Sequence, residues 1–392
     1  MLNPTVYKTN KMERIYFSMP FVEAVMAEVG RLGSKRVFLF CSGSLLRNTD
    51  TINTLMTALG DRYVGHFDKS RPHTPRDSVI EALVAVQEAG GSDLFVAIGG
   101  GAGVDTAKMV GLCLSNNVKT MKDMDVLRDT VDEAGKRHSP QKSDPAARMI
   151  AVATTLSGGE IGQNIGCTDP DRNVKEGYGH PLLMPIAVVY DPALAAHTPE
   201  RLWLASGVKA LDHAVESICA KKPDPVCTEM SLMTVRLLAE HLPRSKADPN
   251  DLEARHGCQF AAWATRSSRS LSSVTFGASH GFGHALGGGY GIPHGETSCV
   301  ILPSVFRYNA SANSDVQARV SEAMGHPGEA AGDVIENLIK SLDLPYRLRD
   351  VGIEKSDFDE IAEHSFDTGT VKANPRPIKA PSDLIEILEN AW

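Results

Sequence analysis

The chain has 392 residues, of which 42% are hydrophobic and 22% are charged, and its formal net charge is −8 at pH 7. Its length allows two domains with substantial cores, and its composition is typical of a globular protein. The acidic balance, without an evident basic patch, excludes a general affinity for nucleic acid. We also expect no membrane span, because no uninterrupted apolar run approaches roughly eighteen residues and the N-terminus lacks the apolar core of a signal peptide.

Cysteine usage indicates a reducing compartment. The seven cysteines are an odd number, and no two of them form a Cys-x-x-Cys pair. Most lie in apolar surroundings, so we expect reduced core residues and a cytoplasmic protein. The cysteines are Cys41, Cys113, Cys167, Cys219, Cys227, Cys258 and Cys299.

Strand and helix patterns alternate through the first half of the chain. Short apolar runs such as KRVFLF (35–40) and LFVAI (94–98) predict buried strands, whereas longer segments with a period of 3.6 residues predict helices. This alternation predicts a parallel, doubly wound sheet with right-handed crossovers. The expected helices cover 21–32, 48–59, 76–89 and a segment ending near 114, and the expected strands cover 35–40, 63–67, 93–98, 149–154 and 182–190.

A glycine-rich stretch joins the strand expected at 93–98 to the helix that follows it. It reads GGGAGVDTAK from Gly99 to Lys108. Glycines between a buried strand and a helix N-terminus let backbone amides approach a phosphate, and the helix dipole favours the anion. An ordinary turn needs one or two glycines rather than four in five positions. We therefore interpret the stretch as a pyrophosphate site, although it is not the G-x-G-x-x-G fingerprint.

The segments after this helix complete the expected first domain. Residues 115–147 are polar and charged, so we expect a surface excursion with one short helix and no chemistry. The next strand leads into TTLSGGE (154–160), whose hydroxyls and glycines can contact phosphate, ribose or nicotinamide. We place an α/β dinucleotide-binding domain over 1–195 and an all-helical catalytic domain over 196–392.

The second half shows helical periods and no convincing strand. We expect the substrate in a cleft between the α/β half and the helical half, because ligand sites favour such junctions. The expected helices cover 200–220, 227–241, 252–269, 303–324, 329–342 and 357–365.

Three histidines lie within fifteen residues in a frame of small, apolar and glycine residues. His280 and His284 are four residues apart, so a helix that begins near Gly277 presents both on one face, and we expect glycines 287–289 to break it. His294 follows on a second helix that returns toward His280. One imidazole alone serves as a metal ligand, a proton donor or a structural group, but three together predict a site.

These motifs resemble the iron-containing alcohol dehydrogenase family, which includes dehydroquinate synthase-like folds, over nearly the whole chain. The family loop GGGS-x-x-D-x-A-K is present as GGGAGVDTAK, with Ala102 in place of serine, and the block H-x-x-x-H-x-x-G-(x)6-H-G runs from His280 to Gly295. The resemblance implies NADH or NADPH as cofactor and a homodimer. We assign cofactor binding to Ser42, Gly99, Gly100, Gly101, Gly103, Asp105, Lys108, Thr154, Thr155 and Ser157.

The first metal motif of that family departs from its pattern here. The motif G-x-D-A-L-x-H supplies two ligands four residues apart, but this chain has Lys209 at the aspartate position and keeps only His213. A protonated ammonium repels a divalent cation by about 4 kcal/mol per unit charge at about 4 Å under an effective dielectric near 20. Asp212 is no evident replacement, because it is turned about 100° from His213 around the helix. We therefore expect no bound metal.

Other details resemble the maleylacetate reductases, a branch of the superfamily that works without a metal. Their loop T-T-x-x-G-x-E matches 154–160, and their block H-x-E-T-x-x-V-x-L-P-x-V-x-x-Y-N matches 294–309. The resemblance implies hydride transfer from NADH or NADPH to a small anionic oxo-acid. The implied reaction is the reduction of maleylacetate to 3-oxoadipate in aromatic degradation.

The resemblance also implies catalytic roles. Lys209 would stabilise the charge of an enolate in place of the metal, among His213, His280 and His294, which are the remnant of a metal site. His284 matches the family histidine near the nicotinamide, and it is our candidate proton donor.

Several alternatives stay open at this point. Lys209 can be a surface lysine on a decayed site. The chain can be an iron- or zinc-dependent alcohol dehydrogenase for a small alcohol or aldehyde that recruits Asp212 or water, or a non-catalytic nucleotide-binding relative. Members that prefer NAD commonly place an acid after the first strand, where this chain has CSGS (41–44), so NADPH should be tolerated.

Overall fold

The computed structural model describes residue 7 and residues 10–131, 137–172, 174–272 and 274–392. The chain divides into a first unit, Asn10–Thr198, and a second unit built from Pro199–Trp392. Each unit has its own core.

The first unit is built on a six-stranded sheet in which all neighbouring strands are parallel. Its order is β1-β10-β7-β4-β2-β3. Strand β3 lies on one side of β2, and β4, β7 and β10 lie on the other side. The order therefore reverses between β2 and β4, and in such sheets ligands bind beyond the carboxyl ends of the strands at this switch point. The strands are β1 (Arg14–Phe17), β2 (Val37–Cys41), β3 (Tyr63–Phe67), β4 (Leu94–Gly99), β7 (Arg148–Ala153) and β10 (Ala187–Tyr190).

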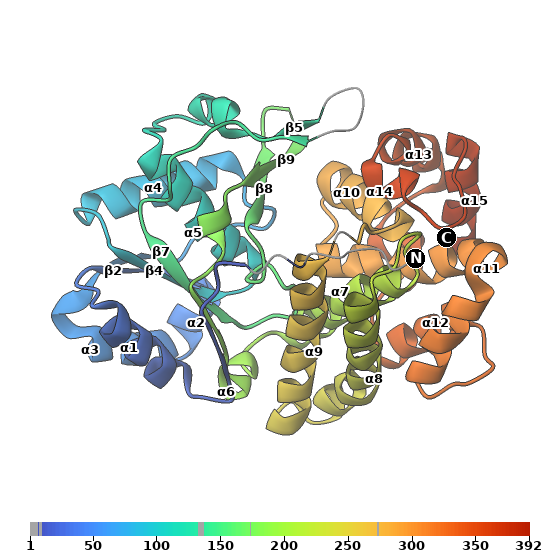
Figure 1. Cartoon of the computed structure of the whole chain (residues 1–392), viewed down its shortest axis with the longest axis horizontal. Helices are drawn as coiled ribbons and strands as arrows, with labels where there is room; N and C mark the ends of the chain where they lie inside the picture. Colours follow the sequence, from blue (N-terminus) through green and yellow to red (C-terminus); the bar gives the residue numbers. More distant parts are fainter. Residues whose placement is uncertain (1–6, 8–9, 132–136, 173, 273) are drawn as a thin grey trace. The chain divides into compact units, whose positions relative to one another are not determined.

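Helices cover both faces of this sheet (Figure 1). On one face, α1 (Phe21–Leu32) and α3 (Thr51–Leu59) share a core with alternate residues of β2, β4, β7 and β10. On the other face lie α4 (Arg76–Glu88) and α5 (Gly101–Ser115). Because strands covered on both faces read as continuous apolar runs, these elements were predictable, and the predicted doubly wound sheet is confirmed.

Several short strands do not follow from the sequence pattern. The edge strand β1 pairs with β10, and β8 (Asn164–Asp169) and β9 (Val174–Gly179) form an antiparallel hairpin. The polar segment after α5 contains the short helix η2 (Lys122–Leu127) and a second small pair, β5 (Thr130–Val131) with β6 (Arg137–His138). None of these short strands contains a long continuous apolar run like those of β2 and β4.

The described part of the second unit contains helices and no strand, as expected. Its centre is α7 (Glu200–Ile218), which is buried over nearly its whole length beyond Leu202 and packs against α8, α9 and α11. A second core joins α10, α11, α13 and α15. The other helices are α8 (Pro225–Ala247), α9 (Leu252–Leu271), α10 (Ala278–Tyr290), α11 (His294–Ala323), α12 (Ala331–Ser341), α13 (Phe358–Phe366), α14 (Gly369–Lys372) and α15 (Pro381–Ala391).

The expected helix break at glycines 287–289 is wrong. Helix α10 continues through these glycines and ends at Gly291, which adopts the left-handed conformation with φ 67°. A Cβ atom at Gly287 would lie 3.2 Å from Cε1 of His294, so glycine permits the close approach of that ring. Helix α11 then begins at His294 rather than at 303, and Pro303 lies inside it.

Two simpler expectations concern the cysteines and the membrane. All seven cysteines are buried and free, as expected. None of the described helices combines the length and apolar character needed to cross a bilayer.

Candidate active site

In the first unit, the predicted cofactor-binding segments meet at the carboxyl ends of β2, β4 and β7. The backbone N–H of Ser42 donates to the carbonyl of Ile98 at 2.9 Å, and that of Thr154 donates to the carbonyl of Gly99 at 3.0 Å. These bonds hold three strand ends side by side. The segments therefore lie at the switch point between β2 and β4.

The glycines of the loop allow the start of α5 to pack closely against the segment after β7. A Cβ atom at Gly100 would lie 3.1 Å from Cγ2 of Thr155, and one at Gly101 would lie 3.2 Å from Oγ of Ser157. Gly100 is the N-cap residue of α5, with no side-chain cap bond. Backbone N–H groups at this helix end are thus available for an anion such as a pyrophosphate.

Lys108 lies deeper in the same unit. Its buried ammonium donates to the carbonyls of Gly159 and Gly162 at 2.7 and 2.8 Å, and it lies 3.9 Å from Asp105. These contacts join α5 to the loop after β7. Lys108 therefore shapes the loop, and direct contact with the cofactor stays a prediction.

An acid that the sequence analysis missed lies beside the end of β2. Asp68 directly follows β3, and its carbonyl oxygen would lie 2.7 Å from a Cβ atom on Gly43. Its carboxylate is 3.2 Å from Nη1 of Arg47. The parallel pairing of β2 with β3 is the signal that could have found it, because neighbouring parallel strands end at the same edge of the sheet.

In the second unit, α7 and the start of α10 bring two of the predicted histidines together. The rings of His213 and His280 stack with their centroids 5.0 Å apart. Phe276 stacks on both, at 5.1 Å from His213 and 3.7 Å from His280. Burial, reinforced by nearby cations, lowers the pKa of both imidazoles well below the usual range. Both rings are therefore neutral at pH 7.

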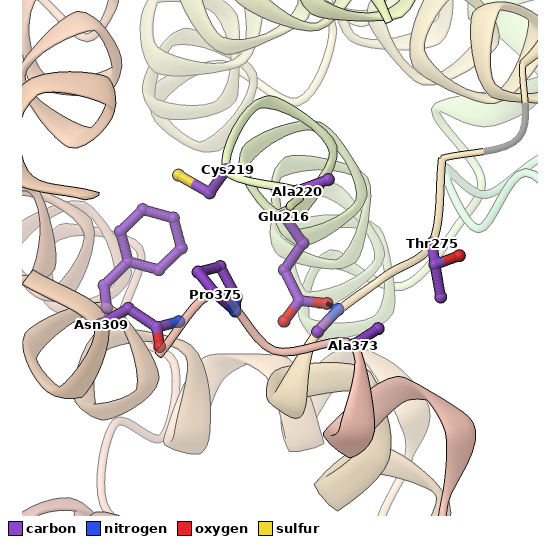
Figure 2. A pocket seen from close by; sticks show the side chains of 9 residues that line it. Glu216, Cys219, Ala220, Thr275, Asn309, Ala373 and Pro375 are labelled. Carbon is purple, nitrogen blue, oxygen red and sulfur yellow. Dashed lines mark hydrogen bonds between the residues drawn. The ribbon is translucent and has the colours of Figure 1, made fainter. Parts of the chain in front are cut away.

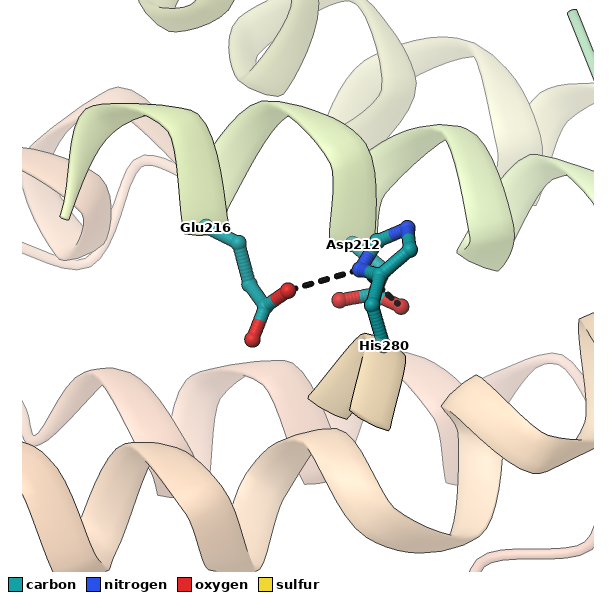
Figure 3. A group of neighbouring side chains, drawn as sticks. All are labelled: Asp212, Glu216 and His280. Carbon is teal, nitrogen blue, oxygen red and sulfur yellow. Dashed lines mark hydrogen bonds and ion pairs between the residues drawn. The ribbon is translucent and has the colours of Figure 1, made fainter. Parts of the chain in front are cut away.

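Glu216, which the sequence analysis did not identify, orients His280 (Figure 3). Its Oε2 atom lies 2.6 Å from Nδ1 of His280, and its two oxygens accept the backbone N–H groups of Gly277 and Ser279. Burial, together with the neighbouring Asp212, raises the pKa of Glu216 to about 8. On the other side of the ring, Nε2 of His280 is buried without a hydrogen-bond partner among the described residues.

Lys209 forms an ion pair rather than standing as an isolated cation. Its ammonium lies 2.9 Å from Oδ2 of Asp212 and 3.1 Å from Oγ of Ser298, which in turn donates to Oδ2 of Asp212 at 2.6 Å. A Cβ atom on Gly283 would lie 4.0 Å from the ammonium, so the charge lies against α10. The side chain of Lys209 is only 12% exposed, which is inconsistent with a surface lysine.

Asp212, which was set aside as a replacement metal ligand, lies within the same group of side chains. Its Oδ2 atom lies 3.7 Å from Nδ1 of His280 as well as beside Lys209. Lys209, Asp212 and Glu216 follow one another at spacings of three and four residues, so they share one face of α7. The sequence analysis judged Asp212 only by its angle to His213 around the helix. It therefore missed the spacing of Asp212 from Lys209 and Glu216, although that spacing is visible in the sequence.

These side chains do not fit a divalent cation as they are arranged. Asp212, Glu216 and His280 offer ligand atoms within 4.8 Å of one another. However, Glu216 shares a hydrogen bond with Nδ1 of His280, and Oδ2 of Asp212 accepts from Lys209 and Ser298. A cation bound through Glu216, Nδ1 of His280 and Oδ2 of Asp212 would have to displace these bonds and face the ammonium of Lys209.

The two remaining predicted histidines flank this group. His284 is exposed on α10, one turn after His280. A positive charge on His284 would lower the pKa of His280. His294 is half-buried at the start of α11, and its charge would similarly affect His213. Their catalytic roles stay predictions.

A cavity of about 10 Å³ lies on the other side of Glu216 (Figure 2). Cys219, Asn309 and Pro375 are among its lining residues. It has room for about one water molecule and none for a substrate. The cavity therefore belongs to the interior packing around Glu216.

Comparison with known proteins defines the family. Residues 13–192 match the family profile described as iron-containing alcohol dehydrogenase, and residues 203–392 match the C-terminal profile of the Fe-containing alcohol dehydrogenase family. The chain therefore belongs to the iron-containing alcohol dehydrogenase family. Its predicted resemblance to the maleylacetate reductase-like branch of that family is confirmed.

Individual relatives cover nearly the whole chain. A maleylacetate reductase from Pseudomonas sp. strain P51 is 28% identical over 97% of this chain and 95% of that protein. The NAD-dependent methanol dehydrogenase of Bacillus methanolicus is 28% identical over 84% of each chain. The crystal structure of maleylacetate reductase from Agrobacterium tumefaciens superposes with a TM-score of 0.81 at 26% identity, covering 100% of this chain and 99% of that one.

Proposed function

We propose that this protein is an NAD(P)H-dependent oxidoreductase that reduces a small anionic oxo-acid, maleylacetate to 3-oxoadipate, without a metal ion. The arrangement of Lys209 carries the proposal. Lys209 stands at the sequence position of a family metal ligand, and its ammonium is held by Asp212 and Ser298. An ammonium has three protons, so these two partners leave one for an oxygen of the substrate.

Each unit has its own role in the proposal. The loop at 99–103 would hold a nicotinamide cofactor, whose chemistry is the supply of a hydride. The hydride adds to the conjugated carbon of the substrate, and the electron pair moves to the oxygen as an enolate. Lys209 donates a hydrogen bond to that oxygen and stabilises its charge. His284 donates the proton that completes the product, while neutral His213 and His280 line the site.

The relatives support the same reaction class, because they include both maleylacetate reductases and an NAD-dependent dehydrogenase. Aromatic degradation, a cytoplasmic location and a homodimer belong to the same proposal. The choice between NADH and NADPH stays open, because Asp68 lies near the end of β2 but its carboxylate is paired with Arg47.

Oxidation of NADH and NADPH should be measured with maleylacetate and with small aldehydes, with and without a chelator. We expect turnover of maleylacetate that the chelator does not inhibit. Lys209→Met should lower kcat/KM by about 10²–10³-fold while nucleotide affinity is unchanged, since it removes a donor to the developing oxyanion. Lys119→Met, which changes an exposed lysine, should leave both values unchanged.

Other outcomes would replace the proposal. Stoichiometric bound metal with chelator-sensitive turnover of alcohols would indicate an iron- or zinc-dependent alcohol dehydrogenase. Tight nucleotide binding without oxidation of NAD(P)H by any oxo-acid would indicate a non-catalytic relative. Lys209→Asp tests separately whether the three histidines meet at one point. It should create a metal site only if the side chains of His213, His280 and His294 converge.

A further inference from the structure

Arg269, near the end of α9, carries a guanidinium that no described carboxylate neutralises. Its Cζ atom lies 3.7 Å from the centroid of the Phe276 ring. Its Nε atom is buried without a hydrogen-bond partner among the described residues, and the acid that acts on its charge, Glu216, does so without an ion-pair contact between described atoms. Buried charges are normally paired, because removal from water costs several kcal/mol in the absence of a partner. The stacking on Phe276 leaves the Nε donor of the half-buried Arg269 unsatisfied.

The position of Arg269 links it to the candidate active site. The ring of Phe276 that contacts the guanidinium also stacks on His280 and His213. The positive charge of Arg269 contributes to the lowered pKa of both imidazoles. Phe276 is thus shared by the arginine and the histidine pair.

Two cations of α9, Arg266 and Arg269, lie close enough to the histidine pair to lower the pKa of His213. Lys209 is paired with Asp212 at 2.9 Å, and its charge still contributes to the lowered pKa of both histidines. Arg266 lies three residues before Arg269 on the same helix, and after burial it is the largest cause that lowers the pKa of Arg269, to about 10. Arg269 is still protonated at neutral pH. An anion is the ligand that this environment favours.

We propose that Arg269, supported by Phe276, binds a carboxylate of the substrate and makes the enzyme select an anionic oxo-acid over a neutral aldehyde. A guanidinium presents planar, paired donors that match the two oxygens of a carboxylate. Stacking on an aromatic ring fixes the plane of those donors and reduces the entropy lost on binding. The inference rests on the proposed function for turnover, but the binding of a dicarboxylate can be measured without turnover.

Calorimetric titration with maleate tests the site directly. Maleate is a dicarboxylate that the enzyme is not expected to turn over, so the titration measures binding alone. Arg269→Met keeps most of the apolar stem and removes the charge, and it should weaken maleate binding by about 10–100-fold. Arg269→Lys keeps the charge but loses the fork, so its loss should be smaller but measurable. Arg236→Met changes an exposed arginine of α8 in the same unit and should bind maleate as the wild type does.

The outcomes separate this inference from the proposed function. Loss of maleate affinity in both Arg269 variants supports the site even where no oxo-acid is reduced. Turnover of maleylacetate with an unchanged KM in Arg269→Met would overturn the site and leave the function standing. Unchanged maleate affinity in Arg269→Met, or no binding by the wild type, would also overturn it. If Arg269→Met does not fold, as judged by circular dichroism, wild-type affinity in Arg269→Lys overturns it.

Discussion

Each unit contains a buried glutamate, Glu176 in the first and Glu216 in the second. The pKa of Glu176 is lowered, whereas the pKa of Glu216 is raised. Glu176 on β9 belongs to a cluster with Arg76, Asp125 and Asp169, which we call the hairpin cluster. Burial opposes ionisation of Glu176, but hydrogen bonds from Arg128 and Arg76 outweigh it and lower its pKa. Glu216 belongs to the histidine cluster, made of Lys209, Asp212, Glu216, His213 and His280. Burial and Asp212 raise its pKa to about 8.

This difference separates charged groups that stabilise the fold from charged groups that could bind a ligand. Both clusters offer three possible ligand groups within 4.8 Å. In the hairpin cluster, Arg76 contacts Asp125 at 2.7 Å and Asp169 at 3.3 Å, and it also pairs with Glu176. In the histidine cluster, Oδ1 of Asp212 and Nε2 of His280 are buried without a described partner. In the hairpin cluster the carboxylates are paired with arginines, although Nε of Arg76 is also buried without a described partner. In the histidine cluster the unsatisfied atoms belong to a carboxylate and an imidazole, which could contact a ligand.

The largest expected effect is on the hairpin cluster. Arg76→Met should lower the free energy of unfolding by about 3–5 kcal/mol, because it removes a buried cation and leaves Asp169 and Glu176 with only the more exposed Arg128 and Arg172. Urea unfolding measures the change. Arg71→Met removes an exposed ion pair with Asp77 and should cost less than about 1 kcal/mol. A loss for Arg76→Met no greater than that of the control would show that the hairpin cluster is not structural.

The next effect concerns pH and the histidine cluster. In the folded state the pKa of Glu216 is about 8, above its ordinary value, so the folded protein holds a proton that the unfolded chain releases. The raised pKa of Glu216 therefore stabilises the folded state at low pH. This stabilisation is lost as the pH rises toward and through about 8. From pH 6.5 to 8.5 the unfolding free energy should fall by about 2 kcal/mol.

Below about pH 6.5 the histidines act in the opposite direction. His213 and His280 have lowered pKa values in the folded state, so acidification stabilises the unfolded chain as its imidazoles bind protons. Glu216→Gln should abolish the fall above pH 6.5, while Glu363→Gln, at an exposed position, should retain it. Denaturant unfolding at several pH values measures both. Equal pH profiles in wild type and Glu216→Gln would contradict the assignment.

The smallest expected effect tests the support of Lys209. Ser298→Ala removes one of the two described partners of the ammonium and one donor to Asp212, so it should cost about 1 kcal/mol in unfolding free energy. Ser270→Ala, at an exposed serine of α9, should change stability by only a few tenths of a kcal/mol. Urea unfolding of the pair decides whether the ion pair depends on Ser298.

The sequence by itself determined the elements whose signals are local. The continuous apolar runs of β2 and β4 predicted a sheet covered on both faces, and the glycines from Gly99 predicted a tight turn into α5. The histidine spacing from His280 predicted a site on α10. These patterns repeat within one strand or one helical turn, so they can be read without knowledge of distant residues.

Only the tertiary structure decided which charges meet. Asp212 and Ser298 are 86 residues apart in sequence, and Glu216 and His280 are 64 apart, yet both pairs form hydrogen bonds at 2.6 Å. Likewise, nothing near Arg269 in the sequence shows that it lacks a carboxylate partner. Periodicity records which side of an element is buried, but the partner of a buried charge depends on the packing of other elements. That physical difference explains why the fold and the histidine block were predictable, whereas the contacts of Asp212, Glu216 and Arg269 were not.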